Sequence, residues 1–311
     1  MTAVSPTGAT SATGACQESR QELRPGRGIA LLLAAIVLFC LMDALAKHLS
    51  KTYPVMQVVW ARYVFHIVLL VPLLFRTDPL RLFRTQRLGL QLSRSLTLFG
   101  STSLFYLAIS LMPLADASSI SAVTPLIVTA LSVPFLGEKV GPRRWAAVCI
   151  GFIGVLIIIR PGPNVINEWA YLPLLNSLCF AFYSLTTRSL SRTDGATTTL
   201  FYSASIGAVL ISLAAPTFWQ SPDFMGWVML ATVGLVGGAS HFLLIRAYDH
   251  APASVLAPFS YVQLIWMAVL GYVFFGDLPD SWTITGALVV AGSGLYVFYR
   301  EAVRRREAQG G

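Results

Sequence analysis

Residues 28–50 read GIALLLAAIVLFCLMDALAKHLS, an apolar stretch long enough to cross a lipid bilayer. A helix rises about 1.5 Å per residue, so about 20 apolar residues span the hydrocarbon, where lipid offers no partner for a bare N–H or C=O group. The sequence therefore predicts an all-α integral membrane protein with ten transmembrane helices joined by short loops. The nine further spans are 54–75, 88–112, 117–136, 144–159, 169–188, 197–215, 225–245, 253–275 and 282–299.

The composition agrees with a membrane protein rather than a soluble one. Hydrophobic residues make up 55% and charged residues 12% of the 311 residues, whereas a soluble domain carries about 25% charged residues. The formal net charge of +8 raises the question of nucleic-acid binding. Because the Lys and Arg residues gather in alternate loops, they indicate membrane topology instead, and we expect no nucleic-acid partner.

The distribution of basic residues predicts the orientation of the chain. Of the 22 Lys and Arg residues, 17 fall in the termini and loops on one side of the predicted membrane. Lys47, Lys51 and Arg160 fall on the other side. Arg62 and Arg94 lie within the spans. Basic loops stay in the cytoplasm, so we expect both termini there, as an even number of spans also requires.

Both ends of the chain are expected to be tails. Residues 1–27, rich in Ser, Thr, Gly and Ala, predict a disordered cytoplasmic tail, and residues 301–311 predict a basic cytoplasmic tail. The small residues at 44–46 resemble a signal-peptide cleavage site. The first apolar stretch has full span length, however, and the basic-residue count requires that it be retained.

The chain matches itself when it is shifted by 139 residues. This common offset indicates two repeats, at residues 28–160 and 169–300. Each repeat holds five spans, and because five is odd, the second repeat must lie inverted relative to the first. Inverted repeats give a transporter two exchangeable states, with the substrate site between them near mid-membrane. The shift aligns Ala108 with Ala247, Pro113 with Pro252, Ser121 with Ser260, Val123 with Val262, Phe135 with Phe274, and residues 137–138 with 276–277.

Short motifs in both halves accompany the duplication: Phe105-Tyr106-Leu107-Ala108, Pro113, residues 117–125, Gly137-Glu138, Arg246-Ala247-Tyr248, Ala251-Pro252-Ala253, Pro258 and Gly276-Asp277. With ten helices in a five-plus-five inverted duplication, they resemble the drug/metabolite transporter superfamily, specifically its EamA-type branch. The resemblance covers residues 28–300 and implies a carrier of small metabolites in the bacterial inner membrane, often of amino acids or related amphiphiles, in either direction. Residues 41–47 and 60–63 resemble a proteobacterial subgroup.

Three ionisable residues in the first two spans are candidates for the transport path. Asp43 lies about seven residues before the outer end of its span and Arg62 about eight residues after the start of the next, so both sit roughly 10 to 12 Å deep. We expect them to pair, either as a permanent brace or as a pair that opens to take a proton and a substrate carboxylate. His66 lies on the same helical face as Arg62. It is either a proton carrier or a neutral imidazole bonded to a backbone carbonyl.

Other charged groups in or near the spans have both structural and functional interpretations. His241 follows several small residues and either ties a close helix contact together or touches substrate. Arg94 is expected to extend its guanidinium to the cytoplasmic interface. Glu138 and Asp277 stand in short turns, where their carboxylates are expected to cap the next helix.

Neutral polar residues predict a belt near mid-depth. Thr124 and Gln263 correspond under the 139-residue shift and lie near prolines that free backbone carbonyls for a ligand or a hinge. They either line a central cavity or join helices by hydrogen bonds. Asn176, Tyr183 and Tyr261 are expected to add amide and phenol contacts.

No enzymatic or nucleotide-binding motif is present, and we expect no cofactor and no metal. The sequence has no Gly-rich loop ending in Gly-Lys-Ser/Thr and no His-Glu-x-x-His, and its cysteines lack metal spacing. The leading interpretation is a secondary transporter of a small-molecule substrate, surrounded by lipid and driven by a proton or cation gradient or by exchange. The alternative is a non-transporting assembly subunit or an intramembrane enzyme. Import and export, and a monomer or a homodimer, are all compatible with the sequence.

Overall fold

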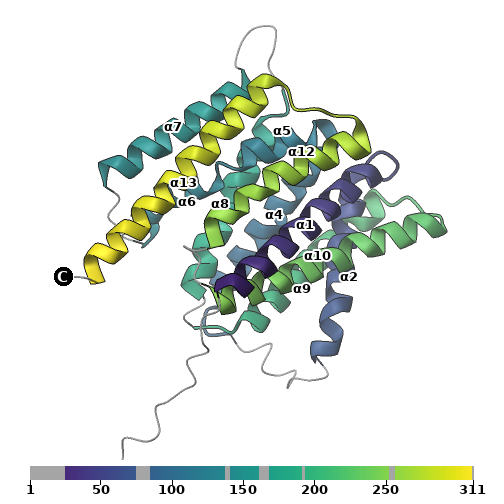
Figure 1. Cartoon of the computed structure of the whole chain (residues 1–311). Coiled ribbons are helices and arrows are strands. Elements are labelled where there is room, and N and C mark those ends of the chain that lie inside the picture. The colour runs from purple at the N-terminus through teal and green to yellow at the C-terminus, as the bar shows by residue number, and fades with distance from the viewer. Residues whose placement is uncertain are drawn as a thin grey trace, which may run out of the picture.

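The computed structural model describes residues 25–74, 85–136, 141–160, 168–190, 193–251 and 256–309. Within these ranges the regular structure is entirely helical, and every predicted span contains a helix (Figure 1). The prediction of an all-α fold is therefore confirmed. The elements are α1 (Pro25–Leu49), α2 (Val55–Leu74), α4 (Leu88–Leu111), α5 (Leu114–Ser121), α6 (Thr124–Leu136), α7 (Pro142–Ile159), α8 (Tyr171–Leu190), α9 (Ala196–Ala214), η1 (Ala215–Thr217), α10 (Phe224–His250), η2 (Ala257–Tyr261), α12 (Val262–Phe275) and α13 (Ser281–Gln309).

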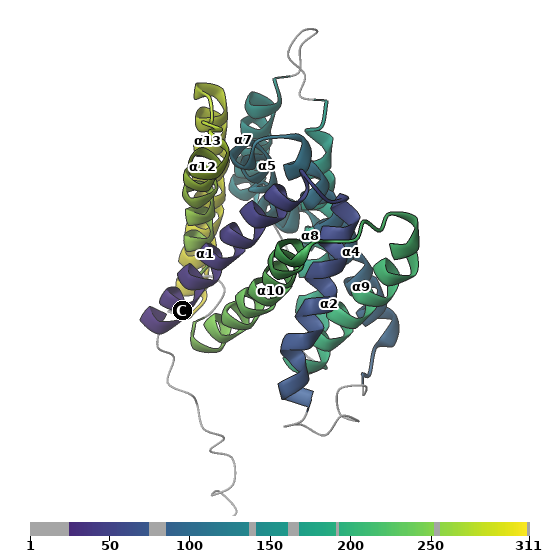
Figure 2. The same ribbon diagram turned by 90° about the vertical axis from the view of Figure 1, so that its right-hand side faces the viewer.

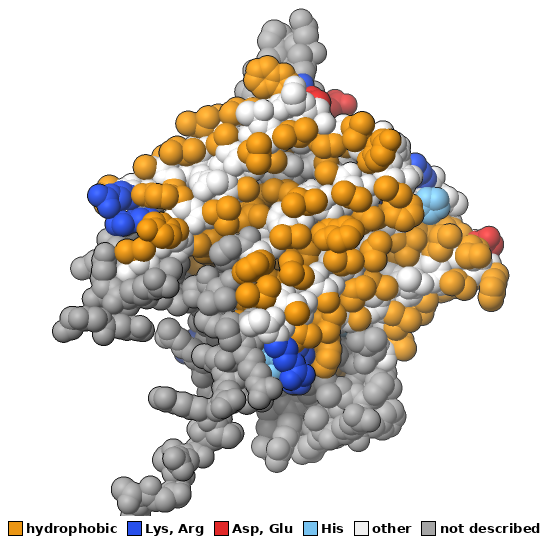
Figure 3. Space-filling view, viewed as in Figure 1, with side chains coloured by type: hydrophobic (Ala, Val, Ile, Leu, Met, Phe, Trp, Pro, Cys, Tyr) orange, Lys and Arg blue, Asp and Glu red, His pale blue; other side chains and the backbone are white. Residues whose placement is uncertain are grey.

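The surface of the helices suits lipid rather than water. Phe224, Leu213 and Leu288 are 83%, 76% and 68% exposed, and hydrophobic side chains cover the face formed by α13, α12, α1 and α10, with charged groups near its borders (Figure 3). Such a continuous apolar surface is unfavourable in water. In the described residues, five helices are long and apolar enough to cross a membrane by length and composition: Gly26–Leu49, Leu114–Phe135, Thr198–Thr217, Phe224–Leu244 and Ser281–Arg300.

The fourth and ninth predicted spans are interrupted, which the sequence analysis did not predict. In the fourth, α5 ends at Ser121 and α6 begins at Thr124, which places Pro125 in the first turn of α6, where a missing N–H is tolerated. In the ninth, the 3-10 helix η2 precedes α12, which begins at Val262. The 139-residue shift brings Val123, inside the first interruption, onto Val262 at the second.

The first half (residues 25–160) and the second half (residues 168–309) interdigitate. Helix α1 packs along α10, α4 along α8, and α7 along α13, while α2 contacts both α9 and α10 (Figures 1 and 2). Glycines allow the closest approaches: a Cβ atom on Gly286 would lie 2.6 Å from the carbonyl oxygen of Gly154, and one on Gly234 would lie 2.6 Å from that of Ala61. Small residues thus bring helices of opposite halves into backbone contact.

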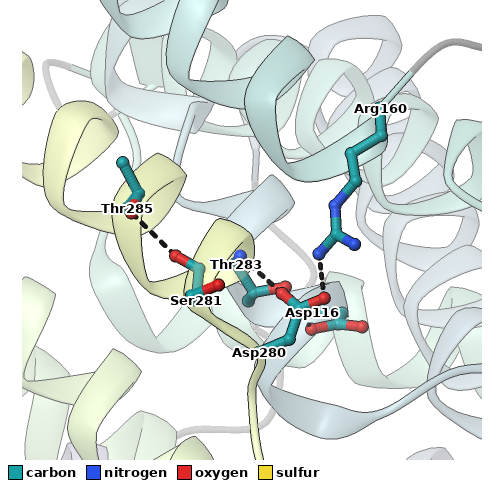
Figure 4. Close-up of polar contacts among 6 residues, drawn as sticks. All are labelled: Asp116, Arg160, Asp280, Ser281, Thr283 and Thr285. Atoms are coloured by element: carbon teal, nitrogen blue, oxygen red, sulfur yellow. Dashed lines mark hydrogen bonds and ion pairs between the residues drawn. The ribbon is translucent and has the colours of Figure 1, made fainter.

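At one end of the bundle, polar contacts join the two halves; we call it the Lys47 end. Lys47 Nζ lies 3.0 Å from Asp277 Oδ2. Figure 4 shows Arg160, at the end of α7, reaching Asp280, which precedes α13. Asp280, rather than the expected Asp277, caps the next helix, because Asp280 Oδ1 accepts from the backbone N–H of Thr283 at 2.8 Å. The other expected cap, at residue 138, lies outside the described residues.

Further contacts close the Lys47 end. Lys47 Nζ also donates to the backbone carbonyl of Met112, at 2.9 Å, next to the start of α5. The hydroxyl of Thr283 donates to Asp116 Oδ1 on α5, at 2.9 Å, and so ties α13 to the first half (Figure 4).

The opposite end is closed by Asp194, between α8 and α9; we call it the Asp194 end. The Asp194 carboxylate accepts hydrogen bonds from Thr85 and Gln91, at 2.5 and 2.8 Å, both from the first half. Although burial opposes the charge, these hydrogen bonds hold the pKa of Asp194 below its ordinary value. The first residues of α1 and the last of α13 lie at the same end of the bundle (Figures 1 and 2).

Candidate functional site

A small polar cavity lies between the two halves. Its walls come from α2 and α4 of the first half and from α8, α9 and α10 of the second. Its volume of about 10 Å³ holds no more than about one water molecule. A molecule larger than water could therefore enter only after the helices move apart. The lining residues are Arg62, Tyr63, His66, Arg94, Leu98, Tyr183, Leu200, Ser203, Ala204 and His241.

Arg62 is held at the junction of α2, α4 and α10. Its Nη1 donates to Thr102 Oγ1 at 2.9 Å, and its Nη2 lies 3.3 Å from His241 Nε2. The guanidinium also lies 5.4 Å from the ring centre of Tyr106. A guanidinium can only donate hydrogen bonds, so the contact with His241 requires a neutral imidazole that accepts at Nε2.

Two histidines stack beside Arg62. The rings of His66 and His241 have centroids 5.7 Å apart and planes 17° apart. His66 lies one turn along α2 from Arg62, as the four-residue spacing predicts. Phe39 of α1 packs edge-on against His241 at 4.9 Å. The stack gives the cavity one flat aromatic wall.

Arg94 is buried, contrary to the expectation that it extends to the interface. It is 3% exposed. Its partners belong to α8 and α9, which the sequence alone does not place beside α4. Its Nε donates to Thr187 Oγ1 at 2.7 Å and its Nη2 to Tyr183 Oη at 2.9 Å. Its Nη1 donates to the Thr199 carbonyl at 3.1 Å and to the Ser203 hydroxyl.

The expected direct pair between Asp43 and Arg62 does not form. Asp43 is buried on α1, 5% exposed, and feels the charge of Arg62, but no ion pair joins them among the described residues. Arg62 instead points to Thr102 and His241. Asp43 does not line the cavity, so both proposed roles for the pair lack the geometry on which they were based.

The expected polar belt does not line the cavity either. Thr124 Oγ1 donates to the carbonyl of Ser121, at 2.7 Å, and so stabilises the helix interruption. Gln263 accepts, through its backbone carbonyl, a weak contact from the Cys40 thiol at 3.9 Å. Neither residue is among those lining the cavity.

Asn176 and Tyr261 also lie outside the cavity. Asn176 accepts from the Ser101 hydroxyl at 2.6 Å and donates to Ser121 Oγ at 3.1 Å, which joins α8 to α4 and α5. Asn176 therefore joins helices by hydrogen bonds and does not line the cavity. Tyr261 packs against Gly294 of α13, and its buried hydroxyl has no hydrogen-bond partner among the residues that the structure describes.

Four of the nine sequence candidates therefore line the cavity, and they come from three helices: Arg62, His66, Tyr183 and His241. Sequence reasoning missed Tyr63 and Ser203, and it assigned Arg94 to the surface. Arg94 carried a usable signal, because an ionisable residue inside a span is costly anywhere except in a protein interior or a cavity. Within the described part of the chain, no group of three or more His, Cys, Asp or Glu residues is placed to hold a metal ion.

Comparisons with known proteins point to one family. The model of the EamA-like transporter family matches residues 26–160 and 167–299. The chain is 29% identical to the S-adenosylmethionine uptake transporter of Rickettsia bellii, over 88% of this chain and 94% of that protein. It is 28% identical to the riboflavin transporter of Vibrio cholerae, over 91% and 96%.

Two further similarities extend the comparison. The chain is 29% identical to the pseudopaline exporter CntI of Pseudomonas aeruginosa, over 85% of this chain and 93% of that protein. A solved crystal structure superposes with a TM-score of 0.64 over 91% of this chain and 99% of the other, at 17% identity. At that identity the superposition shows a shared fold alone.

Proposed function

The chain belongs to the EamA-like transporter family, and on that premise we propose that it is a secondary transporter of a small metabolite that works by alternating access. The observation that carries this proposal is the polar cavity between the halves, where Arg62, Arg94 and two histidines meet. Ionisable groups inside a membrane are costly and typically mark a substrate or ion path. The Ser203 hydroxyl of the cavity wall bonds to Arg94 and to the Thr199 carbonyl rather than to a histidine base, which favours transport over catalysis.

The inverted duplication is part of this proposal. Under the 139-residue shift, Leu111 at the end of α4 corresponds to His250 at the end of α10, and Pro142 at the start of α7 to Ser281 at the start of α13. The helix packing has the same symmetry: exchanging the repeats turns the α1–α10 contact into the α8–α4 contact, and the α1–α12 contact into the α8–α6 contact. These correspondences support repeats at residues 28–160 and 169–300.

The contacts that close the two ends of the bundle suggest how alternating access would work. The Lys47 end and the Asp194 end are each held by contacts between the two halves, and the cavity between them is too small for a metabolite. In the proposed cycle one end opens while the other stays closed. Exchanging the conformations of two inverted repeats produces this alternation. With both termini in the cytoplasm, the Lys47 end faces outward.

The relatives indicate a small metabolite as the substrate but do not indicate which one. Their names include an uptake transporter for S-adenosylmethionine and an exporter of pseudopaline, so the family alone favours neither direction. We propose an amino-acid-like metabolite or a related amphiphile, carried in the bacterial inner membrane. Movement would be driven by exchange or by a proton or cation gradient, because the chain has no nucleotide-binding loop.

Counterflow in proteoliposomes tests this function. Vesicles containing the purified protein are loaded with one unlabelled member of a panel (S-adenosylmethionine, riboflavin and the amino acids) and are then given a trace of the same labelled compound outside. We expect transient, saturable accumulation of at least one member above protein-free vesicles. If folded protein accumulates no member of the panel, the proposed substrate class is wrong.

A further inference from the structure

The charges around the cavity carry a more specific inference, which rests on the proposed function. We propose that the transported molecule carries an oxyanion group, a carboxylate or a phosphate, which binds between Arg62 and Arg94. Both arginines line the same small cavity, Arg62 from α2 and Arg94 from α4. Guanidinium groups match the geometry of carboxylate and phosphate oxygens.

In the part of the chain that the structure describes, neither guanidinium contacts a carboxylate. Arg94 bonds only to uncharged acceptors, namely three hydroxyl groups and one backbone carbonyl. Arg62 contacts the Thr102 hydroxyl and the neutral ring of His241. Among the described residues, no ion pair within contact distance involves either arginine. These hydrogen bonds occupy part of the N–H donors. They leave the buried Arg94 and the partly buried Arg62 without a carboxylate in contact, which is costly for a positive charge.

Asp43 does not remove the excess charge. It attracts Arg62 from α1 without touching it, and it is absent from the cavity wall, which contains no acidic side chain. Even a fully ionised Asp43 balances one guanidinium of the two. The cavity therefore stays positive, and an anionic ligand is the missing counterion.

The remaining walls fit the rest of such a molecule. The stacked rings of His66 and His241 form one side, and Leu98, Leu200 and Ala204 supply apolar surface. An amphiphile with an acidic head would place the head between the arginines and its apolar body against these walls.

Binding of the oxyanion would also loosen the contact between the halves. The acceptors that Arg94 uses lie on α8 and α9 of the second half, whereas Arg94 belongs to α4 of the first. The hydroxyls of Thr187 and Ser203 also bond to carbonyls of their own helices, at 2.6 and 2.8 Å. They therefore remain satisfied when an anion takes the donors of Arg94.

Thermal unfolding of the detergent-purified protein tests the anion site without any transport. Melting temperatures are measured in millimolar sodium acetate, sodium phosphate and sodium chloride at equal ionic strength and pH. We expect acetate or phosphate to raise the melting temperature saturably above chloride, and the stronger of the two identifies the headgroup class. Phosphate also stabilises proteins nonspecifically. Only the rise in melting temperature that is lost in the arginine variants is therefore evidence for the site.

The variants decide whether the two arginines form the site. Arg62→Gln and Arg94→Gln are each expected to weaken the apparent affinity by about tenfold or more, as the loss of a charge-assisted contact predicts. Arg143→Gln, which removes an exposed arginine at the start of α7, should leave it unchanged. Equal melting temperatures of the wild type in all three salts, or an anion effect that survives in both variants, would overturn the proposal.

This outcome is separate from that of counterflow. Transport without an anion effect on the melting temperature would refute the oxyanion site but not the proposed transport function. An anion effect without transport of any panel member would support the oxyanion site and refute the proposed substrate class. For a metabolite that is carried, its neutral amide is expected not to compete, and equal competition by the amide would contradict the site.

Discussion

At the scale of single residues, Arg94 allows the proposed role of a charge in the cavity to be tested. It occupies a buried position whose partners are all uncharged. Replacing a buried ion pair by well-packed apolar side chains is often neutral or stabilising, because the cost of desolvating the charges disappears. We expect the same for Arg94, which has no carboxylate partner to leave behind among the described residues. If the only role of Arg94 were to hold α4 against α8 and α9, its removal would instead lower the stability of the protein.

We therefore predict that Arg94→Met leaves the melting temperature unchanged or raises it, while counterflow falls to the level of protein-free vesicles. The Thr187 and Ser203 hydroxyls keep their bonds within their own helices in this variant. Leu92→Met, on the exposed surface of the same helix and outside the cavity wall, serves as the control and should retain transport. A marked loss of stability in Arg94→Met would show that the arginine is structural.

Asp280 outside the spans offers a pH-dependent test at the same scale. The hydrogen bond from Arg160 holds the pKa of Asp280 below its ordinary value of 3.8, and the N–H of Thr283 adds to the effect, although burial opposes it. A lowered folded-state pKa stabilises the protein above the unfolded value, and this contribution disappears as the pH falls through the folded-state value. Since the carboxylate is about half exposed, the effect is small.

Asp280→Asn keeps the helix cap and removes the charge. We predict a slightly lower melting temperature than the wild type at pH 7 and a difference that vanishes as the pH drops below about 3.8. Asp223→Asn is the matched control, because Asp223 caps α10 in the same way and accepts from Tyr53 rather than from a cation. A difference for Asp280→Asn that persists at low pH would contradict the assignment.

At the scale of elements, glycines decide how closely α7 and α13 approach. A Cβ atom on Gly286 would lie 2.4 Å from the Ile158 side chain and 2.6 Å from the carbonyl of Gly154. Gly292, on the same helix, has open space where its Cβ would be. Because alanine favours helices more than glycine does, packing and helix propensity act in opposite directions at these two positions.

We predict that Gly286→Ala destabilises the protein by about 1–3 kcal/mol through overpacking. Gly292→Ala should be neutral or stabilising by up to about 1 kcal/mol. Chemical denaturation in mixed micelles measures both. Equal effects of the two substitutions would mean that α7 and α13 do not touch at Gly286.

The same scale shows what could be predicted from the sequence. Length and hydropathy placed a span on every α-helix in the described residues, because each segment must meet the membrane requirement separately. The interruption before Thr124 was missed, since Pro125 indicates a lost hydrogen bond but not that a new helix begins one residue before it. The hydrogen-bond acceptors of Arg62 and Arg94 were not predicted, because the helices that carry these acceptors come together only in the folded protein.

For the whole molecule, the central claim is a cavity that opens to each side of the membrane in turn. Its lining comes from both halves, and contacts between the halves close both ends. A rigid scaffold would keep this cavity closed permanently. A transporter must expose the same wall to both aqueous phases.

The direct measurement is labelling of a cavity cysteine by a membrane-impermeant maleimide in right-side-out and inside-out vesicles. Ala204→Cys is made in a chain whose four cysteines are replaced. Thr217→Cys reports topology and should react only from outside. Val209→Cys, 59% exposed on the helix surface, should face lipid and react from neither side. The account predicts that Ala204→Cys reacts from both sides, and protection from either side would contradict it.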